Sequence, residues 1–283
     1  MTTQHGTLVR AMVLDGAARM LWVEAGDLAS KMASTHGLKG RTAQIAAEAM
    51  VANLLMSAYI KGEERVSFQL QCSEPRCAFT GEADAHGQFR GWCSPQRLPA
   101  GDTSLEGILL VIKSNAQREL YRGATPVEST TMGGALNVHL EQNGQLEHVL
   151  RIESEVGDDG HLKAARGVLV EQLPPEDGRQ SVSEQVFQQS FEGLEQASLA
   201  EQAASVAFGQ LWGHPLDVLE ARPLFWKCRC SRQKVEGALM ALDNQNLQEM
   251  YDEDGGASLS CHFCLASYEV RGDDFLALMA RKG

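Results

Sequence analysis

The N-terminal part of the chain begins with an alternation of hydrophobic and polar positions that is typical of β-strands. Residues 8–23 predict a β-hairpin, because Val9, Ala11 and Val13 alternate with other side chains. Asp15-Gly16 suits a two-residue turn between the two strands. The chain is therefore expected to open with a pair of antiparallel strands.

A helical pattern follows this hairpin. Asp27 is expected to cap a short helix that ends near Gly37. Residues 41–59 are rich in Ala, Leu and Met, and their apolar positions recur at helical spacing until Lys61-Gly62 ends the run. This run, which includes the longest nearly apolar stretch of the chain, predicts a long buried helix. It is too short to cross a bilayer, which takes about 20 residues.

From residue 64 the hydrophobic period changes to two, which is the period of a strand. Val66, Phe68, Leu70 and Cys72 are expected to share one face. Strands that occur in runs, with the helices grouped apart, favour an α+β fold over a doubly wound sheet. The further strands are predicted at 78–83, 88–93, 108–113, 119–123, 149–155 and 163–171, with a short helix at 132–142.

A proline-rich segment, Pro174-Pro175-Glu176-Asp177-Gly178, marks the clearest boundary in the chain. The next segment is predicted to be helical, because Ser181–Glu184 and Ser198–Glu201 both fit the capping-box pattern. Its first helix carries an apolar stripe, which either packs on the larger domain, the favoured interpretation, or forms an exposed face for a partner. The stripe consists of Val186, Phe187, Phe191 and Leu194.

The last segment, from Pro223 onward, has the pattern of a small independent module. One or two short helices are expected within 231–250, and Gly255-Gly256 would end them. A hairpin is expected at 259–270, and Asp273 would then cap a final helix. A module this small buries too little to be secure alone and would depend on a metal ion. Val235, Leu239 and Leu242 are predicted to point inward, and the final helix carries Phe275, Leu276 and Met279.

Composition and charge exclude several classes of protein. The 283 residues carry a formal net charge of −12, which disfavours a nucleic-acid partner, since binding to phosphates uses clustered Lys and Arg. The sequence has neither a signal-peptide pattern at its start nor an apolar run long enough for a membrane helix. The paired cysteines without a secretory signal indicate a reducing compartment, so the expected location is the cytoplasm.

Four of the seven cysteines form a constellation that is typical of a zinc site. Cys228 and Cys230 form a CxC pair, Cys261 and Cys264 form a CxxC pair, and thirty residues separate the two pairs. Four thiolates in two close pairs can complete a closed tetrahedral site for one Zn²⁺. With four thiolates available, His262, inside the CxxC pair, is expected to point outward. The spacing alone favours an inert, structural zinc site.

Redox chemistry offers a second interpretation of the same four residues. Zinc holds cysteines as thiolates, and the thiolate is the form that oxidants attack. Zinc binding supplies about 10–16 kcal/mol in small modules, and this is largely folding free energy. Oxidation of the ligands would therefore unfold the module and loosen whatever packs against it, which would make the site a switch.

The segment Phe225-Trp226-Lys227-Cys228-Arg229-Cys230-Ser231-Arg232, the long gap and Cys261–Cys264 resemble the signature of the redox-regulated 33 kDa chaperonins. The resemblance extends through most of the chain, although the matches outside the cysteines are looser. These matches are His36-Gly37-Leu38, Lys61–Val66, Gly167–Pro174 and Leu211-Trp212-Gly213-His214.

The resemblance implies a fold, a mechanism and a set of partners. It implies a substrate-binding and dimerisation domain at 1–177, a helical linker at 178–222 and a four-cysteine zinc redox-switch domain at 223–283. Members of the family are holdases that bind unfolding proteins under oxidative stress without ATP. In the reduced state the four cysteines would hold one zinc ion. On oxidation, the disulfides Cys228–Cys230 and Cys261–Cys264 would form, and the zinc ion would leave. The linker would then unfold, and the active form would often be a homodimer.

Two departures from the family pattern affect these expectations. Around His139–Gln145 the family more often has an aromatic residue and a Ser-Glu-Gln stretch, so activation or dimer contacts are expected to differ. Cys72, Cys77 and Cys93 are not part of the signature. They are interpreted as buried or hairpin thiols, and a second redox pair at Cys72 and Cys77 is the alternative.

The sequence carries no pattern that supports an enzyme. It lacks the phosphate-binding, dinucleotide-binding, zinc-protease and serine-hydrolase motifs. A disulfide oxidoreductase would place its CxxC at the start of a helix, whereas this one precedes a strand-like run. The alternatives to a redox-activated chaperone are therefore a constitutive protein-binding protein with an inert zinc module and, ranked third, a nucleic-acid zinc ribbon.

Overall fold

The computed structural model describes residues 3–98, 104–144, 146–175 and 181–282. The chain forms two compact units, residues 1–227 and residues 228–283. Helices and strands occur in both units, so the predicted α+β class is confirmed. The proposed boundary at 177/178 lies outside the described residues.

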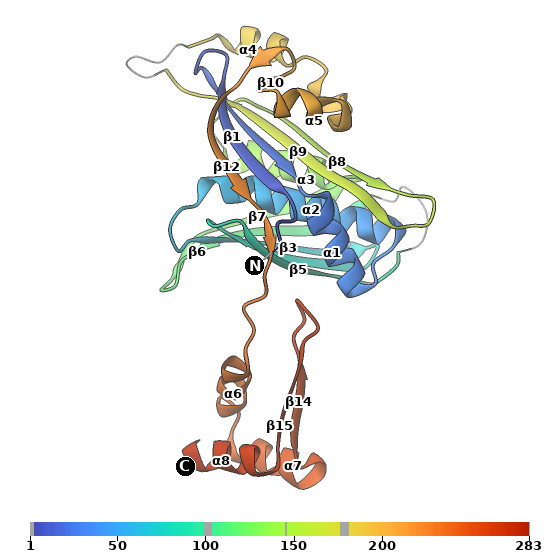
Figure 1. Ribbon diagram of the computed structural model, residues 1–283, viewed down its shortest axis with the longest axis vertical. Helices are drawn as coiled ribbons and strands as arrows, with labels where there is room; N and C mark the ends of the chain where they lie inside the picture. The colour runs from blue at the N-terminus through green and yellow to red at the C-terminus, as the bar shows by residue number, and fades with distance from the viewer. Residues whose placement is uncertain (1–2, 99–103, 145, 176–180, 283) are drawn as a thin grey trace. The chain divides into compact units, whose positions relative to one another are not determined.

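Two sheets form the larger unit (Figure 1). All neighbouring strands run antiparallel except β13, which is parallel to β5. The five-stranded sheet has the order β12 (Asp217–Pro223), β1 (Thr7–Val13), β2 (Ala18–Glu24), β9 (Leu162–Gln172) and β8 (His148–Val156). The six-stranded sheet has the order β13 (Phe225–Trp226), β5 (Gln88–Ser94), β4 (Cys77–Asp84), β3 (Arg65–Glu74), β6 (Leu105–Ser114) and β7 (Glu119–Ser129).

Helices fill the space between the two sheets (Figure 1). Helices α1 (Gly26–His36) and α2 (Gly40–Met56) contact strands of both sheets, and the 3-10 turn η1 (Ser57–Tyr59) extends α2. Helix α3 (Met132–Asn143) packs on α2, β7 and β8. Helix α2 is buried on nearly every side, which explains its nearly continuous run of apolar residues. The prediction of a long buried helix is confirmed.

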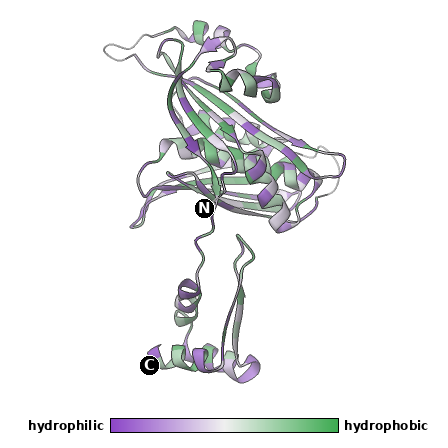
Figure 2. Ribbon diagram, in the orientation of Figure 1, coloured by the Kyte–Doolittle hydropathy of each residue, from purple (hydrophilic) through white to green (hydrophobic). Residues whose placement is uncertain are grey.

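The outer face of the five-stranded sheet is covered by the segment that precedes β12. This covering segment contains α4 (Glu184–Ser190), η2 (Leu194–Gln196), α5 (Leu199–Ala207), β10 (Gln210–Leu211) and β11 (His214–Pro215). Phe187, Phe191 and Leu194 are buried in one cluster with residues of β1, β2 and β9, while Val186 is 46 % exposed. The apolar stripe thus packs on the larger unit, as the favoured interpretation expected. Strands β2 and β9 are therefore covered on both faces and carry long hydrophobic stretches (Figure 2).

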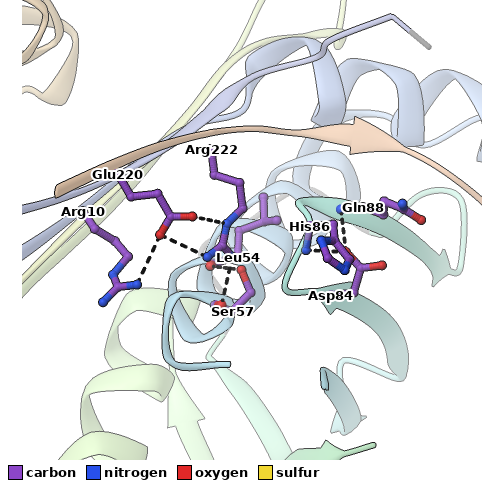
Figure 3. A network of polar contacts seen from close by, with 8 residues as sticks. All are labelled: Arg10, Leu54, Ser57, Asp84, His86, Gln88, Glu220 and Arg222. Carbon is purple, nitrogen blue, oxygen red and sulfur yellow. Dashed lines mark hydrogen bonds and ion pairs between the residues drawn. The ribbon is translucent and has the colours of Figure 1, made fainter. Parts of the chain in front are cut away.

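A polar network holds β12 against β1 and η1 (Figure 3). The carboxylate of Glu220 accepts hydrogen bonds from Arg222 Nε at 2.8 Å and from Arg10 at 3.2 Å. Arg222, whose side chain is only 8 % exposed, also donates to the carbonyl oxygen of Ser57 at 3.3 Å. This strand lies within the segment predicted to be a helical linker, so that segment combines two helices with an edge strand.

The chain that continues from β12 then joins the second sheet. Phe225 N donates to the Gly87 carbonyl oxygen at 2.8 Å, and Lys227 N donates to the Phe89 carbonyl oxygen at 2.9 Å. Gly87 has a φ of +77°, and a Cβ at this position would lie 2.1 Å from the Pro223 carbonyl oxygen. The residues immediately before the first cysteine pair therefore form an edge strand of each sheet, since β12 pairs with β1 and β13 pairs with β5.

The smaller unit consists of α6 (Arg232–Met240), α7 (Asn244–Asp254), the hairpin of β14 (Gly256–Ser260) and β15 (Ser267–Arg271), and α8 (Gly272–Lys282). The predicted helices and hairpin are confirmed, and Gly255 ends α7 in the left-handed conformation. Its described residues form a small hydrophobic core: Leu239, Leu247, Ala257, Val270, Phe275 and Leu278. Leu242, which is predicted to point inward, is 36 % exposed. The prediction was wrong for this residue, because α6 ends at Met240 and Leu242 lies in the turn before α7.

Several predicted helix caps also differ from the structure. Asp27 and Asp273 lie in the first turns of α1 and α8 and do not precede these helices. Ser183, and not Ser181, caps α4 by accepting a hydrogen bond from Val186 N. Ser198 stands at the N-cap of α5 without a side-chain cap, and the carboxylate of Glu153 accepts a hydrogen bond from the N–H of Leu199, the first residue of the helix. A residue that is distant in the sequence thus satisfies one of the free N–H groups at this helix start.

Among the described residues, no helix combines the length and the apolar character needed to cross a bilayer.

Candidate metal centre

The four predicted site residues come together in the smaller unit. The Sγ atoms of Cys228, Cys230, Cys261 and Cys264 all lie within 4.8 Å of one another. Cys228 Sγ is 3.5 Å from Cys261 Sγ, and Cys230 Sγ is 3.4 Å from Cys264 Sγ. Four sulfurs at about 2.3 Å from one ion would be about 3.8 Å apart, so only small shifts separate this arrangement from a tetrahedral site.

Local backbone structure presents each pair of sulfurs on one side of its segment. Cys228 and Cys230 lie in the extended segment before α6, where the N–H of Cys230 hydrogen-bonds the sulfur of Cys228. Cys261 and Cys264 lie in the loop between β14 and β15, which turns tightly because Leu265 N donates to the Cys261 carbonyl oxygen at 2.8 Å. Leu265 adopts a φ of +58°, a left-handed conformation that is unusual for a branched side chain.

The surroundings of the four thiols are electrostatically uneven. Burial is the largest influence on Cys230 and would raise its pKa, but hydrogen bonds from Tyr268 and from the neighbouring thiols lower that pKa to about 7. Tyr268 Oη donates to Cys230 Sγ at 3.0 Å. Burial raises the pKa of Cys228, and it raises the pKa of Cys264 to about 12, even though the N–H of Ala266 donates to the Cys264 sulfur. In the absence of a metal, Cys230 is therefore more readily ionised than Cys228 or Cys264.

The donor set fits zinc. Four thiolates with N–H groups directed at their sulfurs form a soft, closed ligand shell, and this shell suits Zn²⁺ better than a hard cation such as Mg²⁺. His262, inside the CxxC pair, is exposed and does not belong to the cluster, as the sequence predicted. No open ligand position is required, so the arrangement favours a structural or releasable ion over a catalytic one.

Two residues near the thiols were not identified from the sequence. Tyr268 reaches Cys230 because β15 runs back beside the first cysteine pair, a pairing that the local pattern does not reveal. Leu265 could have been noticed as the position after the CxxC pair, where the chain must turn. Both residues help to hold the thiols in place, and neither supplies a ligand atom.

The remaining three cysteines lie in the larger unit. Cys72, Cys77 and Cys93 are buried in the main core, with exposed fractions of 6–7 %. The interpretation of these residues as buried or hairpin thiols is confirmed.

Comparison with known proteins places this fold and this site in a wider context. Residues 6–271 match the family model described as Hsp33 protein. The chain is 25 % identical to the 33 kDa chaperonin of Bacillus subtilis (strain 168), covering 92 % of this chain and 94 % of that protein, and 24 % identical to that of Shouchella clausii, covering 96 % of each. The crystal structure of the 33 kDa chaperonin from Thermotoga maritima has a TM-score of 0.83 and 17 % identity, covering 98 % of this chain and 99 % of that one.

Proposed function

Because this chain belongs to the Hsp33 family of chaperones, we propose that it is a redox-regulated holdase that binds unfolding proteins under oxidative stress without ATP. The observation that carries the proposal is the cluster of four thiols in a module with a very small core. The alternative is a constitutive protein-binding protein whose zinc module has no redox role. We propose a non-enzymatic role in either case.

In the reduced state, Cys228, Cys230, Cys261 and Cys264 would hold one Zn²⁺. The bound ion would cross-link the segment before α6 to the β14–β15 hairpin and would supply folding free energy, which the six buried hydrophobic residues described in the module cannot supply in full. Exposed ion pairs such as Arg232–Glu236 add little, since pairs of this kind contribute about 0–1 kcal/mol. The module would therefore be stable only while its thiolates are available.

Oxidation would consume these ligands. Each disulfide forms when two zinc-bound thiolates lose two electrons, while one molecule of hydrogen peroxide takes up these electrons and two protons from the solvent and is reduced to two molecules of water. We propose the pairings Cys228–Cys230 and Cys261–Cys264, which leave no thiolate for the metal. The closest sulfurs belong to opposite pairs, but all sulfurs of a tetrahedral site are nearly equidistant, so proximity does not select the partners.

The covering segment is the element that this switch would control. The chain continues from this segment through β12 and β13 directly into the first cysteine pair. Unfolding of the zinc module would therefore remove order from the residues that follow the hydrogen bonds of β13, and this would weaken the attachment of β13 and β12. Detachment of this segment would uncover the apolar outer face of β1, β2 and β9 together with the stripe of Phe187, Phe191 and Leu194. We propose this face and this stripe as the surface for client proteins.

The proposed organisation keeps three functional parts: a substrate-binding and dimerisation domain at 1–177, a linker at 178–222 and a zinc redox-switch domain at 223–283. Unfolded or misfolded proteins would be the partners, and a homodimer would form on oxidation. The cytoplasm remains the predicted location.

The decisive experiment treats zinc-loaded protein with hydrogen peroxide at mild heat. Zinc release is followed with a chromophoric chelator, disulfides are mapped by mass spectrometry, and light scattering reports the aggregation of an unfolding client. We expect zinc loss, both proposed disulfides and client protection to appear together. Full zinc loss without a gain in protection would contradict the switch, and maximal protection in the reduced state would establish the constitutive alternative.

Substitution of the ligands separates the site from the switch. Serine at Cys261 and Cys264 should greatly weaken zinc binding, while serine at Cys93, a thiol of the larger unit, should leave it unchanged. Normal zinc affinity in the Cys261→Ser, Cys264→Ser protein would refute the ligand assignment.

A further inference from the structure

We propose that Cys72 and Cys77 form a second thiol–disulfide pair, located in the larger unit and oxidised by hydrogen peroxide independently of the four-cysteine centre. The two residues lie at the ends of the β3–β4 connection and occupy directly opposed positions of the antiparallel ladder. The proposal does not depend on the chaperone function, because it concerns the geometry of one hairpin.

The backbone brings the two thiols within bonding range. Directly opposed residues of an antiparallel pair have Cα atoms about 4.5–5.5 Å apart and point their side chains to the same face. Disulfides occur at Cα separations of about 4.4–6.8 Å, so the bond can form without moving the strands. Only Ser73, Glu74, Pro75 and Arg76 separate the two cysteines along the chain.

Cys93 lies on the same face but is displaced along the sheet. It is opposed to Phe79 on β4, which places it diagonally from Cys77. Diagonal neighbours are about 7–8 Å apart, beyond the usual disulfide range. The three thiols therefore comprise one bonding pair, Cys72 and Cys77, and one bystander, Cys93, which serves as an internal control.

The pair lies close to solvent although its thiols are buried. Cys72 and Cys77 are 7 % and 6 % exposed, and they flank the tip of the hairpin, where Ser73, Glu74 and Arg76 are exposed. Hydrogen peroxide is only slightly larger than water, and both residues keep a small exposed fraction at the end of the hairpin. A disulfide closed here would tie together strands that are already paired, so the fold of the larger unit would be retained.

The environment assigns different roles to the two thiols. Hydrogen bonding from Cys72 and the positive charge of Arg41 lower the pKa of Cys77, against the effect of burial. The same hydrogen bond, together with burial, raises the pKa of Cys72. The Cys77 thiolate would attack hydrogen peroxide and become a sulfenic acid with release of hydroxide. The Cys72 thiol would then attack that sulfur, and the hydroxyl would leave as water once the proton of Cys72 is transferred to it.

The sequence allows a direct test on the full-length, zinc-loaded protein. Trypsin cleaves after Arg65, Arg76 and Arg90, so Cys72 and Cys77 fall on separate peptides, 66–76 and 77–90, and Cys93 falls on a third, 91–97. After treatment with hydrogen peroxide, free thiols are blocked with iodoacetamide in denaturant and the digest is analysed without reduction. We expect the linked pair of peptides 66–76 and 77–90, and an alkylated Cys93.

Variants test the assigned roles and the independence from the metal centre. In Cys72→Ser, the sulfenic acid at Cys77 should persist and be trapped by dimedone, whereas Cys93→Ser should leave the linked pair unchanged. The linked pair should also form when all four cysteines of the centre are replaced by serine, whatever becomes of chaperone activity.

Three results would overturn the proposal. The first is complete alkylation of Cys72 and Cys77 under conditions that oxidise the four-cysteine centre. The second is a linkage of either residue to Cys93. The third is the absence of the linked pair from the protein without the four-cysteine centre, provided that circular dichroism shows a folded larger unit.

Discussion

Tyr268 is a side chain outside the four cysteines that acts directly on the thiol centre. Its hydroxyl donates to Cys230 Sγ at 3.0 Å, and this contact contributes to the lowered pKa of Cys230. A donor to a ligand sulfur stabilises the thiolate and fixes its position. Loss of such a supporting contact typically lowers metal affinity about 10–100-fold.

We predict that Tyr268→Phe weakens zinc binding about tenfold, because it removes the hydroxyl and keeps the ring. Competition with a chromophoric chelator measures the affinity. Tyr251→Phe is the matched control, since Tyr251 stacks on Phe275 at 6.1 Å in the same module and belongs to α7, away from the cysteine loop. Equal affinities of the two variants would show that the hydrogen bond to Cys230 has no role in metal binding.

At the scale of elements, β12 depends on a guanidinium that is nearly excluded from solvent. Arg222→Met should keep most of the side-chain volume but lose the hydrogen bonds to Glu220 and to the Ser57 carbonyl oxygen. We expect amide exchange in residues 217–223 to become about tenfold faster, which corresponds to about 1.4 kcal/mol of local opening free energy.

Hydrogen exchange followed by mass spectrometry measures this effect. Arg122→Met is the control, because the Arg122–Glu119 pair on β7 is about half exposed and should contribute little. Unchanged exchange in β12 of the Arg222 variant would mean that the backbone ladder alone holds the strand.

The covering segment contains three phenylalanines, of which two are buried and one is exposed. Phe191 is 1 % exposed and packs edge-on against Phe187, with ring centroids 5.5 Å apart, whereas Phe208 is 87 % exposed. Phe191→Ala should cost about 3–5 kcal/mol of packing and weaken the attachment of the segment to the sheet. The proposed function then predicts partial client protection by the reduced, zinc-loaded variant.

Client aggregation assays compare this variant with Phe208→Ala, which removes the same side chain from an exposed position. Phe208→Ala should behave like the unaltered chain in the reduced state. If Phe191→Ala also remains inactive although hydrogen exchange shows a loosened segment, the covered face of β1, β2 and β9 is not the client surface.

At the scale of the whole molecule, the two units differ in what stabilises them. The larger unit has an extensive core between and outside its sheets, while the smaller unit buries six hydrophobic residues. The metal would supply the missing free energy for the smaller unit only.

We therefore predict that removal of zinc from the reduced protein with a chelator abolishes protection from hydrogen exchange in residues 232–282 and leaves β2 and β9 protected. Added Zn²⁺ should restore the lost protection, and Mg²⁺ should not, since it prefers oxygen ligands. Retention of full protection in the smaller unit without metal would show that its own core suffices.

Local patterns were sufficient for most of the secondary structure. Alternation in β3 and helical spacing in α2 predicted both elements correctly, because strand and helix each impose a period that a short stretch of sequence already displays. Exact helix starts were less predictable. At α5, the predicted Ser198 makes no side-chain cap, and a carboxylate from β8 accepts the hydrogen bond from the first N–H of the helix.

The sequence by itself determined the four-thiol constellation, since sulfur pairs at CxC and CxxC spacing can share an ion wherever the module lies. Only the tertiary structure decided which apolar positions are covered. Phe187, Phe191 and Leu194 are buried because a sheet lies beneath them, whereas Leu242 and Leu276 remain exposed because nothing covers them sufficiently. The tertiary structure likewise decided two contacts, that of Tyr268 with Cys230 and that of Cys72 with Cys77. Burial and contact depend on which segments meet after folding, and a local sequence pattern does not contain that information.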